Sequence, residues 1–206
     1  MRALGVGAAL ALGLGLWAQE ARAQCGADHS SCPQAAATGT ELCKPALATV
    51  IEQASRNELG SDGPAYRQIH TGCNHPNPPV NVTATYPCTL GKAVAQVESG
   101  WQMFCASACG QSGLTLISFD CGYGITQVTS GMGGGAGFDP ARVAAEPKYN
   151  VGTGAKIMMD KWAATPCVGD NRPDIAEDWY MAVWAYNGFG FVNNPNNPNF
   201  PASRPP

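Results

Sequence analysis

Hydrophobic residues recur every three or four positions in four stretches of the chain, a spacing that is typical of amphipathic helices. The clearest stripe consists of Leu90, Val94, Val97, Trp101 and Phe104. The other three stretches cover residues 45–58, 151–162 and 174–186. These patterns predict a core that is built mainly of helices.

The helix expected at 174–186 carries signals at both ends. It begins with Asp174 and Glu177 in the spacing of a capping box, and it stops at an Asn-Gly pair. Trp162 and Trp179 continue the apolar faces of the last two helices, so we assign both side chains to the core.

Little sheet is expected between these helices. Residues 115–120, TLISFD, have the composition of a short strand. The glycine-rich stretch 131–137 has no lysine or threonine partner for phosphate and no dinucleotide fingerprint, so we interpret it as a flexible loop. The predicted fold class is therefore α+β, mainly α.

Composition divides the chain into four parts. Residues 1–23 have the pattern of a secretory signal peptide, since Arg2 precedes an apolar run and an Ala-Arg-Ala cleavage pattern follows it. The run is short for a bilayer span, although an uncleaved anchor is the alternative. We expect a cysteine-containing segment packed on the core at 24–88, the core itself at 89–191, and a disordered Asn/Pro-rich tail at 192–206.

All nine cysteines follow the expected cleavage site, and an exported chain of this kind is expected to form disulfides. An odd count allows at most four internal bridges and leaves one thiol over. We predict a bridge from Cys73 to Cys88 across a proline-rich loop, and a bridge from Cys105 or Cys109 within or beside the segment that carries them. The alternative is zinc, because His70, Cys73 and His75 lie close together. However, CxxC and HExxH motifs are absent from the sequence, so we expect no metal and no cofactor.

The formal net charge is −3, and the chain contains no basic run. This charge pattern argues against nucleic acid as a partner. It also provides no long-range attraction to an anionic cell wall, so any wall binding requires a cleft. We expect no stable membrane insertion, and a monomer.

Glu98 is the first candidate for chemistry. It follows Val97 and lies one helical turn from Val94 and Trp101, which places it at the edge of the apolar stripe. Partial desolvation of a carboxyl raises its pKa, as a general acid near neutrality requires. The alternative is a solvated glutamate on the flank of the helix, and periodicity alone leaves both interpretations open.

Four short motifs follow one another across residues 89–191. They are Glu98-Ser99 with Trp101; Ser118 with Gly122 and Gly124-Ile125-Thr126-Gln127; Asn150 with Gly154; and Ala185-Tyr186-Asn187-Gly188. In this order the motifs resemble those of the lysozyme-like lytic transglycosylases, which cleave bacterial peptidoglycan. The resemblance covers about half of the chain, and residues before Cys88 take no part in it.

The resemblance implies a lysozyme-like fold and cleavage of the MurNAc-GlcNAc β-1,4 linkage in peptidoglycan glycan strands. Glu98 would act first as acid and then as base, while the 6-hydroxyl of the muramic sugar attacks to give a 1,6-anhydro product. Tyr186 and Asn187 would orient the N-acetyl group of the substrate. Ser99, Ser118 and Gln127 would support the cleft. The expected location is secreted or periplasmic.

The chain also departs from the family pattern, and alternatives follow. An extra segment carrying Cys105 and Cys109 separates Glu98 from Ser118, and the two glycines of the second motif lie one residue closer together than usual. Goose-type lysozymes share the architecture but use water, and Asp120 is the candidate carboxylate for positioning it; a turn-forming aspartate is the plainer interpretation. A chitin-type substrate, or a glycan-binding or scaffold module without turnover, also stays open.

Overall fold

The computed structural model describes residues 25, 29–191, 194 and 197–198. The signal peptide expected at 1–23 and most of the tail expected at 192–206 lie outside the described residues. The helices are α1 Lys44–Ser55, α2 Cys88–Ser99, α3 Pro140–Ala145, α4 Pro147–Ala164 and α5 Tyr180–Tyr186, with short 3-10 turns at Gly60–Asp62 and Glu177–Trp179. The strands are β1 Thr38–Thr40, β2 Ile69–Thr71, β3 Val80–Val82 and β4 Ser112–Leu114. The prediction of an α+β chain dominated by helices is confirmed.

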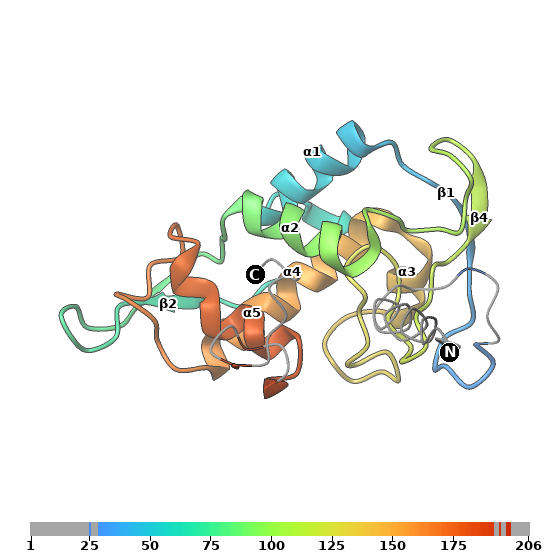
Figure 1. Cartoon of the computed structure of the whole chain (residues 1–206). Helices are drawn as coiled ribbons and strands as arrows, with labels where there is room; N and C mark the ends of the chain where they lie inside the picture. Colours follow the sequence, from blue (N-terminus) through green and yellow to red (C-terminus); the bar gives the residue numbers. More distant parts are fainter. Residues whose placement is uncertain (1–24, 26–28, 192–193, 195–196, 199–206) are drawn as a thin grey trace, which may run out of the picture.

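Helix α4 runs through the middle of the molecule and packs against α1, α3, α5 and β2 (Figure 1). The main core lies around it and draws its apolar side chains from α1, α2, α4 and α5. Trp162 and Trp179 are buried there, with ring centroids 4.2 Å apart, as the sequence predicted. Leu47 and Ile51 of α1 belong to the same core, so the chain before Cys88 is part of the main body.

A second, smaller core lies beside the first, beneath the loop that connects β4 to α3. Its buried members are Ile117, Tyr123, Val128, Met132, Val143, Ala144 and Tyr149. Helix α3, which the sequence analysis did not predict, covers part of this core. Asp139 caps α3, since its Oδ1 accepts hydrogen bonds from the amides of Ala141 and Arg142, and Pro140 occupies the first helical turn. This Asp-Pro signal is readable in the sequence.

Each of the two sheets is an antiparallel pair of short strands. β1 pairs with β4, and β2 pairs with β3, at opposite ends of the molecule (Figure 1). The strand predicted at 115–120 is wrong. β4 ends at Leu114, and the chain then curls back on itself so that the amide of Ser118 donates to the carbonyl of Gly122.

The stripe in the second predicted helix is interrupted. α2 ends at Ser99 because Gly100 and Trp101 adopt left-handed backbone angles, with φ of 63° and 71°. Trp101 and Phe104 therefore reach the main core from a loop instead of from the helix. Val97, assigned to the stripe, is 75% exposed. The helix predicted at 174–186 also starts late, since α5 begins at Tyr180 after the 3-10 turn at Glu177–Trp179, and Asp174 pairs with the guanidinium of Arg172 instead of capping a helix.

Four disulfides join Cys25 to Cys105, Cys32 to Cys121, Cys43 to Cys109, and Cys73 to Cys167. Cys88 is the free thiol. Four bridges with one cysteine left over match the prediction, but the bridge from Cys73 to Cys88 is wrong. Cys88 begins α2, whereas Cys73 meets a segment 94 residues away along the chain. The bridge predicted within or beside the segment that carries Cys105 and Cys109 is also wrong, because these cysteines pair with Cys25 and Cys43, which lie 80 and 66 residues earlier in the chain.

Within the part of the chain that the structure describes, no helix has the length and apolar character needed to cross a bilayer.

Candidate functional site

The candidate site is a cleft of about 350 Å³ between the two cores. It is lined by Glu98, Ser118, Phe119, Asp120, Gln127, Thr129, Tyr186, Asn187 and Gly188. The lining residues come from the end of α2, the loop that covers the second core, and the end of α5. Segments that are nearly 90 residues apart in the sequence therefore meet here. All of the site residues predicted from the sequence line this cleft, with the exception of Ser99.

Glu98 lies in the last turn of α2 and is partly buried. Desolvation raises the pKa of Glu98 from its ordinary value of 4.5 to about 7, and the negative charge of Asp120 adds to the rise. The direction agrees with the expectation from its place at the edge of the stripe. A carboxyl of this kind holds its proton at neutral pH and can also release it, so it is suited to act as both acid and base.

Ser99 connects the Glu98 helix to the glycine-rich turn. Its hydroxyl donates to the carbonyl of Ile125 at 2.8 Å and accepts from the amide of Gln102 at 3.2 Å. The first bond crosses from α2 to the loop that carries Gln127. Ser99 therefore fixes the position of Glu98 from behind the cleft and does not line it.

Asn150 fastens the glycine-rich turn to α4. Its side chain is fully buried; Oδ1 accepts from the amide of Thr126 at 3.1 Å, and Nδ2 donates to the carbonyl of Tyr123 at 2.7 Å. One helical turn later, a Cβ at Gly154 would lie 2.6 Å from the side chain of Thr126. The spacing of Asn150 and Gly154 thus allows the turn to lie directly against the helix.

The side chain of Gln127 stabilises the glycine-rich turn by a hydrogen bond within it. Its Nε2 donates to the carbonyl of Gly124 at 2.7 Å, and the residue lines the cleft. A Cβ at Gly122 would lie 2.7 Å from Gln127 Oε1 and 2.8 Å from Ser118 Oγ. Glycine is therefore required at this position by close packing.

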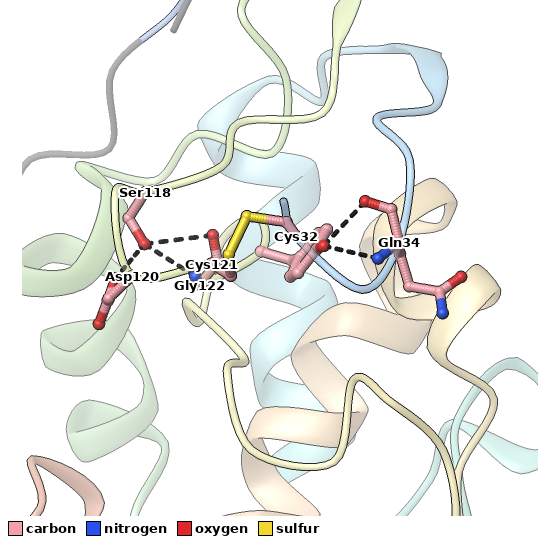
Figure 2. The surroundings of a disulfide bond; sticks show 7 residues. Cys32, Gln34, Ser118, Asp120, Cys121 and Gly122 are labelled. Carbon is pink, nitrogen blue, oxygen red and sulfur yellow. Dashed lines mark hydrogen bonds between the residues drawn. A yellow bond between two sulfur atoms is a disulfide. The ribbon is translucent and has the colours of Figure 1, made fainter. Parts of the chain in front are cut away.

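Ser118 and Asp120 form the tip of the loop, as Figure 2 shows. The buried hydroxyl of Ser118 accepts from the amide of Gly122 at 2.8 Å and donates to Oδ1 of Asp120. Asp120 itself is exposed to solvent. Asp120 is therefore part of the turn and also presents a carboxylate to the cleft that contains Glu98.

The N-terminal segment holds this loop in place through two links, which we call the brace. The first is the disulfide between Cys32 and Cys121 (Figure 2). The second is a pair of hydrogen bonds: the amide of Gln34 donates to the hydroxyl of Tyr123 at 2.9 Å, and that hydroxyl donates to the carbonyl of Gln34 at 2.8 Å. Sequence reasoning missed the brace, because its partners are about 90 residues apart and no local signal joins them.

Tyr186 and Asn187 form the other wall at the end of α5. The hydroxyl of Tyr186 donates to the carbonyl of Thr126 at 2.6 Å. Burial raises the pKa of Tyr186 above its usual range, and the charge of Glu98 acts in the same direction, so the phenol stays protonated. Asn187 and Gly188 are exposed at the mouth of the cleft.

Three lining residues, Phe119, Thr129 and Gly188, were not among the site residues predicted from the sequence, and Phe119 stands out among them. It is 81% exposed, although it is a large aromatic side chain. A phenylalanine between the site residues Ser118 and Asp120 was the signal that could have pointed to it.

No cluster of three metal-binding side chains occurs among the described residues. Cys73, considered above as a zinc ligand, is part of a disulfide. Comparison with known proteins found no matching family model, no matching curated protein and no matching solved structure.

Proposed function

We propose that this chain is an exported enzyme that cleaves the MurNAc-GlcNAc β-1,4 linkage of peptidoglycan as a lytic transglycosylase. The observation that carries the proposal is the desolvated carboxyl of Glu98, with a pKa near 7, in a cleft that also contains Tyr186 and Asn187. The order of the sequence motifs supports the same assignment. Four disulfides support an oxidising compartment, and thus a secreted or periplasmic location.

In the proposed reaction, protonated Glu98 donates its proton to the glycosidic oxygen as the bond to the anomeric carbon breaks. The carboxylate that results then accepts the proton of the muramic 6-hydroxyl, whose oxygen bonds to the anomeric carbon. The products are a 1,6-anhydro sugar and a new free 4-hydroxyl, and Glu98 returns to its protonated state. A pKa near 7 suits both steps, because neither protonation state is strongly favoured at neutral pH.

The polar side chains of the cleft are suited to an N-acetylated sugar. The amides of Gln127 and Asn187 offer both donors and acceptors, which is what an acetamido group requires. The Tyr186 hydroxyl is already bonded to Thr126, so we assign to Tyr186 a role in holding the two walls together beside the substrate.

Hydrolysis is the second candidate, and Asp120 is the observation that favours it. Its carboxylate lines the same cleft and lies close enough to raise the pKa of Glu98. Two carboxyl groups facing one cleft are the usual arrangement for glycoside hydrolysis. In that case Asp120 would position a water molecule in place of the 6-hydroxyl.

The deciding experiment is mass analysis of the products released from purified peptidoglycan. Anhydro ends support the lytic reaction, whereas reducing ends, which are heavier by one water, support hydrolysis. Glu98→Gln keeps the shape of the side chain but removes the titrating proton, so it should lower the rate by roughly 10²–10⁴-fold. Asp120→Asn should have little effect on lytic turnover and a large effect on hydrolysis. Wild-type turnover by Glu98→Gln would refute the assignment of Glu98 as the catalytic acid and base. If the wild-type protein binds peptidoglycan without cleaving it, the glycan-binding module is the function that remains.

A further inference from the structure

Phe119 has no structural role that would explain its position. It is the most exposed large hydrophobic side chain of the described residues, at 81%. A phenyl ring in water forgoes the free energy that burial would give it, and such rings on a surface often mark binding sites. Neither of the two cores includes Phe119.

The backbone that carries Phe119 is held at several points. Ser118 before it is buried and bonded to Gly122, and Cys121 after it is linked to Cys32 (Figure 2). The amide of Cys121 also donates to the carbonyl of Ser118 at 3.1 Å, which closes a turn around Phe119. The ring is therefore presented to solvent from a fixed turn, a placement that reduces the entropic cost of binding.

The surroundings of the ring indicate what it contacts. Phe119 lines the cleft together with polar side chains on the same loop, among them Asp120 and Gln127. On the other wall, a Cβ at Gly188 would meet no atom within 4 Å, so there is open space beside the cleft mouth. An exposed aromatic face among hydrogen-bonding groups is complementary to a pyranose ring, which has a flat C–H face and hydroxyls around its edge.

We infer that Phe119 is a stacking platform for a β-linked pyranose ring next to the bond that Glu98 cleaves, and that it determines affinity for the glycan. This inference rests on the proposed function. The ring hydrogens on the C–H face of a β-1,4-linked sugar carry partial positive charge, and they pack against the negative face of the phenyl ring. Phe119 contributes to binding and takes no part in proton transfer.

The test measures binding of a hexamer of β-1,4-linked N-acetylglucosamine by calorimetry, in a Glu98→Gln background so that the probe is not consumed. Adding Phe119→Ala should weaken binding about tenfold, which corresponds to ~1.4 kcal/mol. Adding Phe119→Trp should keep binding within about threefold of the parent, since an indole offers the same kind of face. Val97→Ala is the matched control, because Val97 is 75% exposed and adjacent to Glu98 but does not line the cleft.

All variants should melt at the same temperature as the parent, because the substituted side chains are exposed. In the protein that retains Glu98, Phe119→Ala should raise KM for peptidoglycan with little change in kcat. The proposal that Phe119 stacks on a sugar ring is overturned if Phe119→Ala binds the hexamer as tightly as the parent. It is also overturned if the parent does not bind the hexamer. If the wild type cleaves the wall but Phe119→Ala binds the hexamer undiminished, the proposed enzymatic function is kept and the role of Phe119 as a stacking platform is rejected. If Phe119→Ala binds the hexamer tenfold more weakly but the wild type does not cleave peptidoglycan, the stacking platform is kept and the proposed enzymatic function is rejected.

Discussion

The two walls of the cleft are built in different ways. The wall at 118–129 is a loop over the small core, held by a disulfide, by Gln34 and by the buried side chain of Asn150. The wall at 186–188 is the C-terminal end of a short helix on the large core, and its link to the loop is the hydrogen bond from Tyr186 to Thr126. One wall is fixed by links that cross the molecule, while the other depends on helix packing and one hydrogen bond.

The contrast shows how an irregular segment can be as well positioned as a helix. The small core contains seven buried residues, fewer than the large core, so we expect packing alone to hold the loop less firmly. Covalent and polar links to the N-terminal segment make up the difference. We therefore expect changes in the brace to affect the position of Ser118 and Asp120, and changes on the α5 side to have smaller effects.

Removal of the disulfide in the brace should have the largest effect on stability. Cys32→Ser with Cys121→Ser should lower the free energy of unfolding by about 2–4 kcal/mol and lower activity roughly tenfold or more, because the loop loses its position. Cys73→Ser with Cys167→Ser is a matched control, since the two bridges span 89 and 94 residues and constrain the unfolded chain almost equally. Urea unfolding and wall cleavage measure both. Equal loss of activity in the two variants would contradict a special role for the brace.

Replacing Glu98 by Gln should produce the next largest change in stability, and the size of this change should depend on pH. The pKa of Glu98 is raised from 4.5 to about 7 in the folded protein. Protonated Glu98 therefore contributes fully to the free energy of unfolding below pH 4.5, and this contribution is lost as the pH rises through 7. Above pH 7, Glu98→Gln removes a partly desolvated charge. The full pKa shift corresponds to about 3.4 kcal/mol, and because solvent screens the partly exposed side chain we expect a gain in stability of about 2 kcal/mol. At pH 4.5 the gain should vanish. Urea unfolding at pH 4.5 and pH 9 tests this, and an equal gain at both would contradict it.

Tyr186→Phe should have a smaller effect, since it removes one hydrogen bond between the walls and leaves the carbonyl of Thr126 unpaired. We expect a loss of about 1 kcal/mol in unfolding free energy. Tyr180→Phe is the control on the same helix, because Tyr180 is 36% exposed and its hydroxyl donates a longer hydrogen bond, of 3.3 Å, to Asn194. Thermal melts of both variants provide the measurement. A loss that is no greater for Tyr186 than for Tyr180 would show that the bond between the walls contributes little.

Asp120→Asn should produce the smallest shift, in the pH dependence of cleavage. Activity requires protonated Glu98 and should fall as the pH rises through about 7. The negative charge of Asp120 adds to that pKa, so its removal should move the decline to lower pH by a fraction of a unit. Initial rates between pH 5 and 9 measure the midpoint. A midpoint that moves upward would contradict the charge coupling between Asp120 and Glu98.

The sequence predicted the residues of the cleft better than the backbone that holds them. Glu98 and Tyr186 were placed together on the strength of motif order, and both line one cleft. Periodicity failed where local backbone geometry changes, since α2 stops at Gly100 and leaves Val97 in solvent. Pairing across long separations has no local signal, so the Cys73 bridge was assigned to a near neighbour instead of Cys167.

The four disulfides have a consequence for the production of the chain, because none joins cysteines that are neighbours in sequence order. As the chain emerges into an oxidising compartment, Cys25, Cys32 and Cys43 become available before any of their partners. Pairing in order of emergence would therefore form incorrect bridges. Correct assembly requires thiol–disulfide exchange, in which a thiolate attacks an incorrect bridge and releases a sulfur for its proper partner. We therefore expect oxidative folding of this chain to need a disulfide isomerase, and we expect an oxidase alone to leave part of the chain with incorrect bridges.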